Sequence, residues 1–212
     1  MHIALIGASG FIGSALLAEA LARGHQVTAV VTRPEKIGPH AQLTVRKVDV
    51  LATDDLAAVL RGHDAVLTAF SGHAQPDILA YYLRGFGSIV TATRQAGVPR
   101  LLAVGGAGSL EVAPGVQLLD TPQFPDAYKP TAEGARQALA LLRTETALDW
   151  TLLSPSAEIF PGERTGHFRL GGDQLLADAQ GKSRISVQDY AVALIDELEK
   201  PRHSRQRFTV GY

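Results

Sequence analysis

The 212-residue sequence predicts an α/β fold built on a doubly wound parallel sheet. Short apolar runs recur along the chain, and they are nearly continuous rather than alternating, as in strands covered on both faces. Between these runs lie helical patterns that stop at glycine or proline. Such an alternation of strands and helices requires parallel strands joined by right-handed crossovers.

The predicted strands and helices follow one another in a regular order. Strands are expected over residues 2–6, 26–31, 43–48, 65–69, 100–104 and 150–154. Helices are expected over residues 12–21, 54–61 and 77–97, from about residue 130, and over 187–200. The last helix opens at Ser186, which forms an S-x-x-D capping box with Asp189 and marks a helix start.

Composition excludes several classes of protein. Twenty basic and 21 acidic residues leave a net charge of −1, so no overall field favours nucleic acid or an anionic membrane. The absence of cysteine excludes disulfides, thiolate catalysis and cysteine-based metal sites. The seven histidines form no H-E-x-x-H motif, and we expect no metal. The apolar runs are too short to span a bilayer, and the N-terminus resembles a strand rather than a signal peptide, so a cytoplasmic location is expected.

Domain organisation is expected to be simple. Because the chain has no internal repeat and no low-complexity linker, residues 1–212 are predicted to form a single domain. Stretches rich in proline and glycine, residues 114–130 and 155–172, follow late strands, where an open α/β sheet places its substrate loops. Residues 155–185 are therefore expected to form a small C-terminal substrate region. The basic cluster 202–207 is expected to be solvated.

A glycine-rich turn is the most specific motif. The pattern G-x-x-G-x-x-G leaves the first strand and opens the first helix. In this position Gly7 permits a tight turn, Gly10 lets backbone N–H groups approach a diphosphate, and Gly13 allows close packing of helix on sheet. The turn predicts a bound dinucleotide, and the fold is then of the Rossmann type. The residues expected to contact the cofactor here are Gly7, Ser9, Gly10, Phe11, Ile12 and Gly13.

Cofactor choice depends on the end of the second strand. A protein that prefers NAD usually offers an acidic residue there to the ribose hydroxyls. This chain has Thr32 and Arg33 instead, with Glu35 further on. A guanidinium can bind a 2′-phosphate through charge-assisted hydrogen bonds, so NADP(H) is favoured and NAD(H) stays an alternative. The competing interpretation of Arg33 is a solvated side chain.

Further cofactor contacts are expected where later strands end. The third strand ends near Asp49, which either accepts a hydrogen bond from adenine or only caps the strand. The end of the fourth strand is expected to line the ribose, and the end of the sixth is expected to hold the carboxamide by main-chain groups, while the end of the fifth is also expected to contact the cofactor. The residues concerned are Asp49, Val50, Phe70, Ser71, Gly72, Val104, Gly105, Ser154, Pro155 and Ala157.

With these motifs the chain resembles the atypical short-chain dehydrogenase/reductase superfamily. The likeness is closest to its NAD(P)H-flavin-reductase and biliverdin-reductase-B-like branch, which is related to NmrA-like proteins. It covers essentially the whole length and includes the glycine turn, Arg33, residues 49–50, 101–110, 150–155 and 185–191. The resemblance implies a Rossmann sheet with a small C-terminal substrate region and an NADPH-dependent oxidoreductase activity.

The chain departs from the superfamily at its acid–base residues. The usual Tyr-x-x-x-Lys pair is missing, because Tyr128 and Lys129 are adjacent and Arg136 aligns with the lysine of NmrA-like proteins. Gly106 stands where the superfamily has serine, and the chain contains no asparagine. A standard alcohol or sugar dehydrogenase is therefore disfavoured.

Two functions remain open. The first is hydride transfer from NADPH to a flavin, quinone or tetrapyrrole-like acceptor, since a flavin takes hydride at N5 and obtains its proton from water. Ser109, Tyr128 and Lys129 are the candidates for contacting that acceptor, although a turn serine, a loop tyrosine and a solvated lysine are equally good interpretations. The second is a non-catalytic NADP(H)-binding redox sensor of the NmrA-like type that signals to a protein partner.

Overall fold

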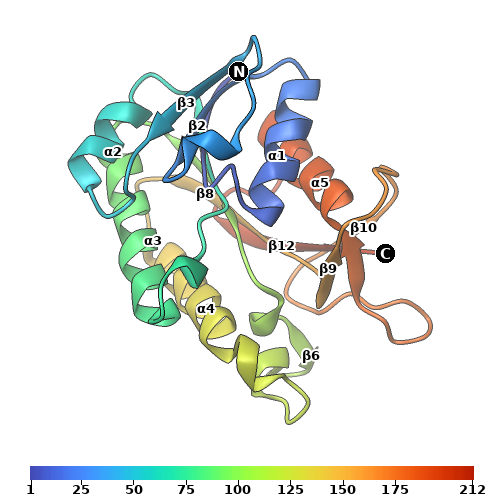
Figure 1. Cartoon of the computed structure of the whole chain (residues 1–212). Helices are drawn as coiled ribbons and strands as arrows, with labels where there is room; N and C mark the ends of the chain where they lie inside the picture. Colours follow the sequence, from blue (N-terminus) through green and yellow to red (C-terminus); the bar gives the residue numbers. More distant parts are fainter.

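The structure is a computed structural model that describes residues 1–73 and 75–212. Its centre is one twisted sheet in the order β10-β12-β8-β5-β4-β1-β2-β3, with helices on both faces (Figure 1). All neighbouring strands are parallel except β10, which pairs antiparallel with β12. The predicted doubly wound α/β fold is therefore confirmed.

The N-terminal half builds one wing of the sheet. Its elements are β1 (His2–Ile6), α1 (Phe11–Ala22), β2 (Gln26–Val31), β3 (Leu43–Lys47), α2 (Thr53–Leu60), β4 (Ala65–Thr68) and α3 (Ile78–Gln95). The chain moves outward from β1 through β2 to β3, and then returns to β4 on the other side of β1. The strand order thus reverses between β1 and β4, which is where open α/β sheets bind their ligands.

The C-terminal half continues in the other direction. Its main elements are β5 (Arg100–Val104), α4 (Lys129–Thr144), β8 (Asp149–Ser154), α5 (Val187–Glu199) and β12 (Gln206–Gly211). Short strands extend from it: β6 (Glu111–Ala113) pairs with β7 (Val116–Gln117), and β9 (Glu158–Phe160) pairs with β11 (Arg184–Ser186). The remaining strand, β10 (Arg169–Gly171), lies at the sheet edge.

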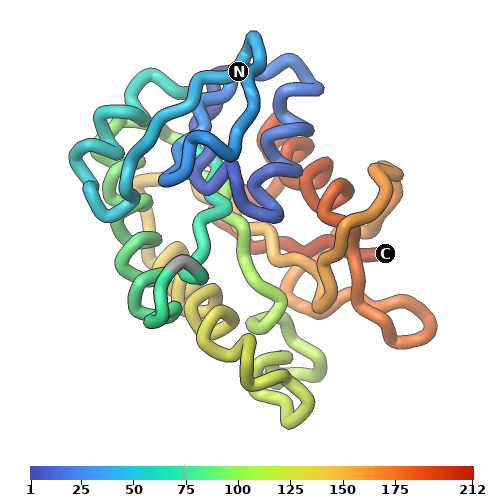
Figure 2. Tube along the Cα trace, in the orientation of Figure 1, coloured from blue at the N-terminus to red at the C-terminus, as the bar shows by residue number. Residues whose placement is uncertain are grey.

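The sheet separates two hydrophobic cores, one on each of its faces. One is shared by α2, α3 and α4 and includes Phe86, Leu139 and Trp150. The other is shared by α1 and α5 and includes Leu16 and Tyr190. The tube in Figure 2 shows the same division, with α1 and α5 together on one side and α3 and α4 together on the other. Because both faces are covered, every central strand is almost completely buried, as its continuous apolar sequence predicts.

The end of the chain differs from the prediction. The expected solvated cluster 202–207 leads directly into β12, which pairs in parallel with β8, and Arg207 itself is buried within that strand. Its guanidinium is neutralised by Asp173, so a charge that argues against a strand locally is satisfied by a distant partner. The prediction of a solvated cluster is therefore wrong for Arg207.

Candidate functional site

The glycine turn is as tight as its sequence requires. Gly7 has φ of 79°, and a Cβ atom there would lie 2.8 Å from the carbonyl oxygen of Ala69, just after β4. A Cβ at Gly13 would lie 2.0 Å from the carbonyl oxygen of Gly7. The turn is closed by a hydrogen bond from the Gly10 N–H to the Gly7 carbonyl, at 3.0 Å. Only glycine at both positions lets β1, β4 and α1 meet so closely.

The amino end of α1 has the properties of an anion site. Its N-cap is Gly10, no side chain of the described residues caps it, and its first turn contains no acidic residue. The hydroxyl of Ser14 bonds the carbonyl of Phe11 instead of an N–H group. The first N–H groups of the helix therefore face outward with the positive end of the helix dipole. This arrangement suits the diphosphate that the glycine pattern predicts.

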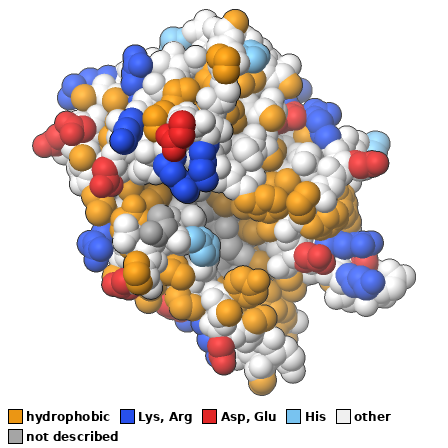
Figure 3. Space-filling view, viewed as in Figure 1, with side chains coloured by type: hydrophobic (Ala, Val, Ile, Leu, Met, Phe, Trp, Pro, Cys, Tyr) orange, Lys and Arg blue, Asp and Glu red, His pale blue; other side chains and the backbone are white. Residues whose placement is uncertain are grey.

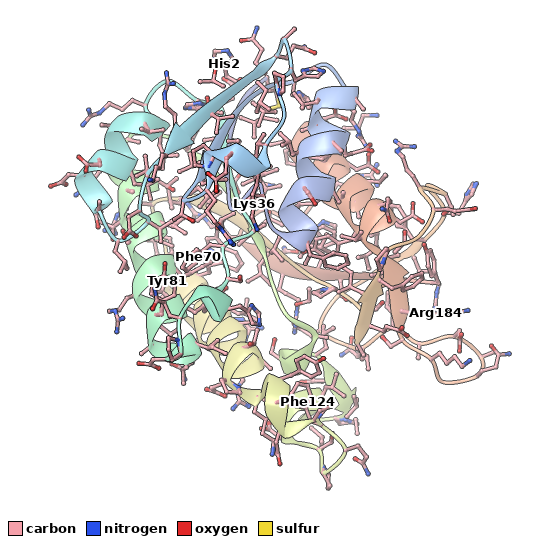
Figure 4. The ribbon with its side chains drawn as sticks, in the orientation of Figure 1. His2, Lys36, Phe70, Tyr81, Phe124 and Arg184 are labelled. Carbon is pink, nitrogen blue, oxygen red and sulfur yellow. The ribbon has the colours of Figure 1, made fainter. Side chains whose placement is uncertain are left out.

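Basic side chains stand beyond the second strand. Arg33 and Lys36 are exposed and take part in none of the ion pairs found among the described residues. Lys47 ends β3 opposite Val31, so it lies at the same edge of the sheet. In Figure 3, basic side chains gather at the upper rim of the hollow in the middle of this face, and Figure 4 labels Lys36 on the segment after β2. Lys36 was not among the residues predicted to bind cofactor.

Aromatic side chains cluster around Phe70, in the loop after β4. The ring of Phe70 stacks on Tyr82 at 5.8 Å and lies 5.5 Å from the ring of Tyr81, which Figure 4 also labels. Phe70 also fills the space beside Gly85, where a Cβ atom would lie 2.4 Å from its ring. Burial, and then the negative charge of Asp49, raise the pKa of the Tyr81 hydroxyl, so Tyr81 stays a neutral donor.

Asp49 and Val50 form the end of the third strand segment. The Asp49 carboxylate accepts a hydrogen bond from the Leu51 N–H at 2.9 Å, which is the capping role considered for it. The carbonyl of Val50 accepts a hydrogen bond from Ser88 of α3, and its side chain is buried. Asp49 is exposed, and only one of its two carboxylate oxygens accepts a hydrogen bond from the described residues.

The loops after the other strands are tightly packed, and some of their backbone groups are hydrogen-bonded within the protein. Gly72 and Gly105 are packing positions, because a Cβ atom would lie 2.3 Å from the Ile78 carbonyl oxygen in the first case and 2.3 Å from Leu152 in the second. At the end of β8 the Ser154 carbonyl accepts from Thr209, and the Ala157 N–H donates to Ser183. The expected cofactor residues in these loops are Ser71, Gly72, Val104, Gly105, Ser154, Pro155 and Ala157, and they lie at one edge of the sheet.

The three candidate acceptor residues are not brought together. Ser109 is buried, and its hydroxyl accepts a 3.4 Å hydrogen bond from Arg207, which makes the same contact to Ser154. Lys129 forms an exposed ion pair with Asp126 at 2.6 Å. Tyr128 remains highly exposed, at 63%. Of the three, Tyr128 alone offers an exposed aromatic ring to a planar molecule.

Opposite faces of α4 explain this separation. Ala135 lies against Gly106, just after β5, where a Cβ on the glycine would come within 2.9 Å of it. Thr131 precedes it by one turn and therefore shares that inner face. Lys129 and Arg136 lie on the other side, where they line an outer groove of about 840 Å³ between the starts of α3 and α4. The groove is also lined by Asp77, Asp120 and Glu133, so it lies between the starts of α3 and α4 and the 118–120 segment.

Arg136 cannot take the part of the superfamily's lysine in this arrangement. Its guanidinium donates two hydrogen bonds to the Asp120 carboxylate, at 2.9 and 3.0 Å, and it also pairs with Glu133. These partners raise the pKa of Arg136 against the opposing effect of burial. The side chain is therefore committed to holding the 118–120 segment against α4.

A segment before β10 is anchored to both helices of one face. Arg164 donates two hydrogen bonds to Glu19 of α1, at 2.7 and 2.8 Å. Asp189 at the start of α5 accepts from the Thr165 hydroxyl at 2.6 Å and from the Gly166 N–H at 2.8 Å. We refer to residues 161–168 as the strap. It belongs to the region 155–185 that the sequence predicts to lie on the substrate side.

The described residues contain neither a metal-binding cluster nor a membrane-spanning helix. Within residues 1–73 and 75–212 no three histidine, aspartate or glutamate side chains cluster closely enough to hold a metal ion. None of the helices in these ranges combines the length and apolar character needed to cross a bilayer.

Fold and site together define a dinucleotide-binding α/β protein of the Rossmann type. A family model described as NAD(P)H-binding matches residues 7–198, and the chain belongs to this NAD(P)H-binding family. The resemblance to atypical short-chain dehydrogenases/reductases is thereby confirmed, and a nicotinamide cofactor with it.

Relatives cover the chain from end to end. The protein YwnB of Bacillus subtilis is 40% identical over 99% of this chain and 98% of its own length. A Bacteroides thetaiotaomicron structure, described as a proposed epimerase, is 47% identical with a TM-score of 0.94 and covers 100% of this chain and 96% of its own. A Streptococcus pneumoniae structure, described as a proposed NADH-flavin reductase, is 38% identical with a TM-score of 0.85 and covers 100% and 99%.

Proposed function

We propose that the chain is an NADPH-dependent reductase that transfers hydride to a flavin or a similar conjugated small molecule. The observation that carries the proposal is the uncapped amino end of α1 beside the exposed cations Arg33 and Lys36. The first suits a diphosphate, and the second suits the additional phosphate that distinguishes NADPH from NADH. The description of the Streptococcus pneumoniae relative as a flavin reductase supports the reaction class.

The missing acid–base pair limits the acceptor. An epimerase or alcohol dehydrogenase of this superfamily needs a tyrosine with a lysine four residues on, and this chain has adjacent Tyr128 and Lys129 and a neutralised Arg136. A flavin, quinone or tetrapyrrole asks less of the protein, because alignment of the two ring systems supplies much of the rate. Tyr128 is proposed to contact the acceptor ring. Ser109 and Lys129 are proposed to act indirectly, through the loop and helix that carry them.

The alternative is a sensor that binds NADP(H) without turnover and signals to a protein partner. Its support is the same dispersal of Ser109, Tyr128 and Lys129. A cytoplasmic location and a single domain over residues 1–212 remain predictions of the sequence.

Steady-state oxidation of NADPH tests the proposal. The purified chain is assayed with FMN, FAD, a quinone and biliverdin, each against an enzyme-free control, and cofactor binding is measured by calorimetry in parallel. Acceptor-dependent turnover above the control supports the reductase. Binding of NADPH without turnover on every acceptor supports the sensor, and no binding of any nicotinamide cofactor overturns both.

A further inference from the structure

We propose that His73 is the proton donor for acceptors that need one, and that Thr131 holds its ring in place. The inference rests on the proposed reductase function and assigns a residue that the superfamily's missing tyrosine leaves open. Neither residue was predicted from the sequence to take part in the site.

Position is the first support. His73 lies in the loop after β4, directly behind Phe70, Ser71 and Gly72, the residues expected to line the ribose. The carboxyl end of β4 is next to the point where the strand order reverses. The imidazole is exposed, so it is accessible to a bound ligand. Within the described ranges no other histidine lies in the loop directly after β1, β4, β5 or β8, and the exposed His167 lies on the strap, beyond β9.

Its hydrogen bond is the second support. The Nε2 atom of His73 lies 3.1 Å from the hydroxyl of Thr131, in the first turn of α4. Thr131 shares the inner face of α4 with Ala135, which packs on Gly106 after β5. The contact therefore joins the loop after β4 to the helix after β5, along the edge where a nicotinamide and its acceptor are expected to lie.

The contact also fixes which nitrogen is available. With Nε2 held by Thr131, Nδ1 has no hydrogen-bond partner among the described residues. A protonated ring donates Nε2–H to Thr131 and presents Nδ1–H to a ligand.

The charged groups on the two elements that carry His73 and Thr131 have other partners. Asp77, on the same loop, accepts the N–H of Ala80 at the start of α3. Lys129, at the start of α4, pairs with Asp126. No carboxylate of the described residues lies within 4.0 Å of the His73 ring. Among the described residues, no ion pair therefore competes with a ligand for the His73 ring.

The acceptor receives its hydride and its proton from two different donors. A C–H bond of the dihydronicotinamide breaks, its hydride forms a new bond to an electron-poor atom of the acceptor, and NADPH becomes NADP+. The negative charge that develops on a conjugated oxygen or nitrogen of the acceptor takes the proton from Nδ1 of His73, which is regained from water. The acceptors whose reduction this proton donor would accelerate are neutral quinones and conjugated carbonyl compounds. A cationic phenazinium needs hydride alone, because its product is already neutral.

The experiment compares a neutral quinone with N-methylphenazinium as acceptors for wild type and His73→Gln. We expect the quinone kcat to fall about 100-fold in the variant, in line with general-acid catalysis, while the phenazinium rate stays within about two-fold. The wild-type quinone kcat should decline as pH rises, because a general acid must be protonated, and this dependence should vanish in the variant. Thr131→Val should lower the quinone kcat several-fold, and Thr131→Ser should restore it.

His40→Gln is the matched control, since His40 is an exposed imidazole near the start of β3, at the opposite edge of the sheet. It should leave both rates unchanged. An equal loss on both acceptors in His73→Gln would show a structural role, and an unchanged quinone rate and pH profile would exclude the proton donor. If wild type turns over neither acceptor, the proposed reductase function fails before His73 is at issue.

Discussion

Arg207 of β12 and Asp173 are joined across the substrate side of the sheet. The Nε atom of Arg207 donates to Asp173 at 2.7 Å, and a second nitrogen of the same guanidinium also contacts this carboxylate. The third nitrogen reaches the hydroxyls of Ser109 and Ser154. One buried cation thus fastens the loop after β5, the end of β8 and the segment between β10 and β11.

Replacing Arg207 with Met should therefore loosen the acceptor side and destabilise the fold. We expect a loss of about 2 kcal/mol in the free energy of unfolding, because buried hydroxyls lose their donor while the half-exposed Asp173 can be solvated. Urea denaturation measures the loss, and calorimetry with NADPH should give an affinity near that of wild type. Arg202→Met, an exposed arginine of the same basic cluster, is the control and should change stability by less than about 0.5 kcal/mol. Equal stabilities for the two variants would contradict this role.

Two glycine substitutions should separate folding from cofactor binding. Gly13→Ala places a Cβ atom 2.0 Å from the Gly7 carbonyl oxygen, so it should cost about 3 kcal/mol of stability and abolish NADPH binding. At Gly10 the nearest atom would be 3.4 Å away, so Gly10→Ala should fold normally. Its methyl group stands where the diphosphate approaches, and the Kd for NADPH should rise at least about 10-fold. Gly38→Ala, in open space, should change neither quantity. Normal NADPH affinity in Gly10→Ala would place the diphosphate elsewhere.

Cofactor selectivity should depend on Arg33 and Lys36. Arg33→Ala should raise the Kd for NADPH about 10- to 100-fold, as expected for losing charge-assisted hydrogen bonds to a phosphate, and should leave the Kd for NADH nearly unchanged. Lys36→Ala should have a smaller effect in the same direction, because a lysine contributes a single flexible charge. Thermal shift with each cofactor reports both constants. Arg61→Ala, an exposed arginine at the end of α2, serves as the control. Equal losses for both cofactors would refute recognition of the 2′-phosphate.

The ion pair between Glu19 and Arg164 should make stability sensitive to acid. The hydrogen bond from Arg164 lowers the pKa of Glu19, burial opposes this, and Arg23 lowers it further. Because the folded-state pKa is below the usual value of 4.5, the contribution is complete above that pH and is lost as pH falls through the lower, folded value. Arg164→Met should lower stability by about 1 kcal/mol at pH 7 and by less at pH 3. Urea titrations at the two pH values measure the difference, and a pH-independent loss would contradict it.

The local motifs of the sequence predict the nucleotide half of the molecule well. The turn from Gly7 to Gly13 needs only neighbouring residues to fix its geometry, so its pattern is readable without the fold. The same holds for Ser186, whose hydroxyl accepts the Asp189 N–H as the capping pattern predicts.

Long-range partners explain what the sequence does not predict. The Asp189 carboxylate binds Thr165, Gly166 and Tyr212 rather than completing the capping box, and no local signal indicates these contacts. Arg207 resembles a tail residue until Asp173, far along the chain, is seen to neutralise it. The face of α4 that Lys129 occupies depends on where the helix begins. The structure begins α4 at Lys129 itself. Side chains that depend on such partners were predicted least well.

The strap is bound to helix α1, the same helix whose amino end is proposed to bind the coenzyme. The amino end of helix α1 is the proposed coenzyme site. Further along the same helix, Glu19 binds Arg164 of the strap. Any displacement of α1 would be carried to the strap through this ion pair. Helix α1 and the strap therefore form one mechanical unit at this side of the sheet.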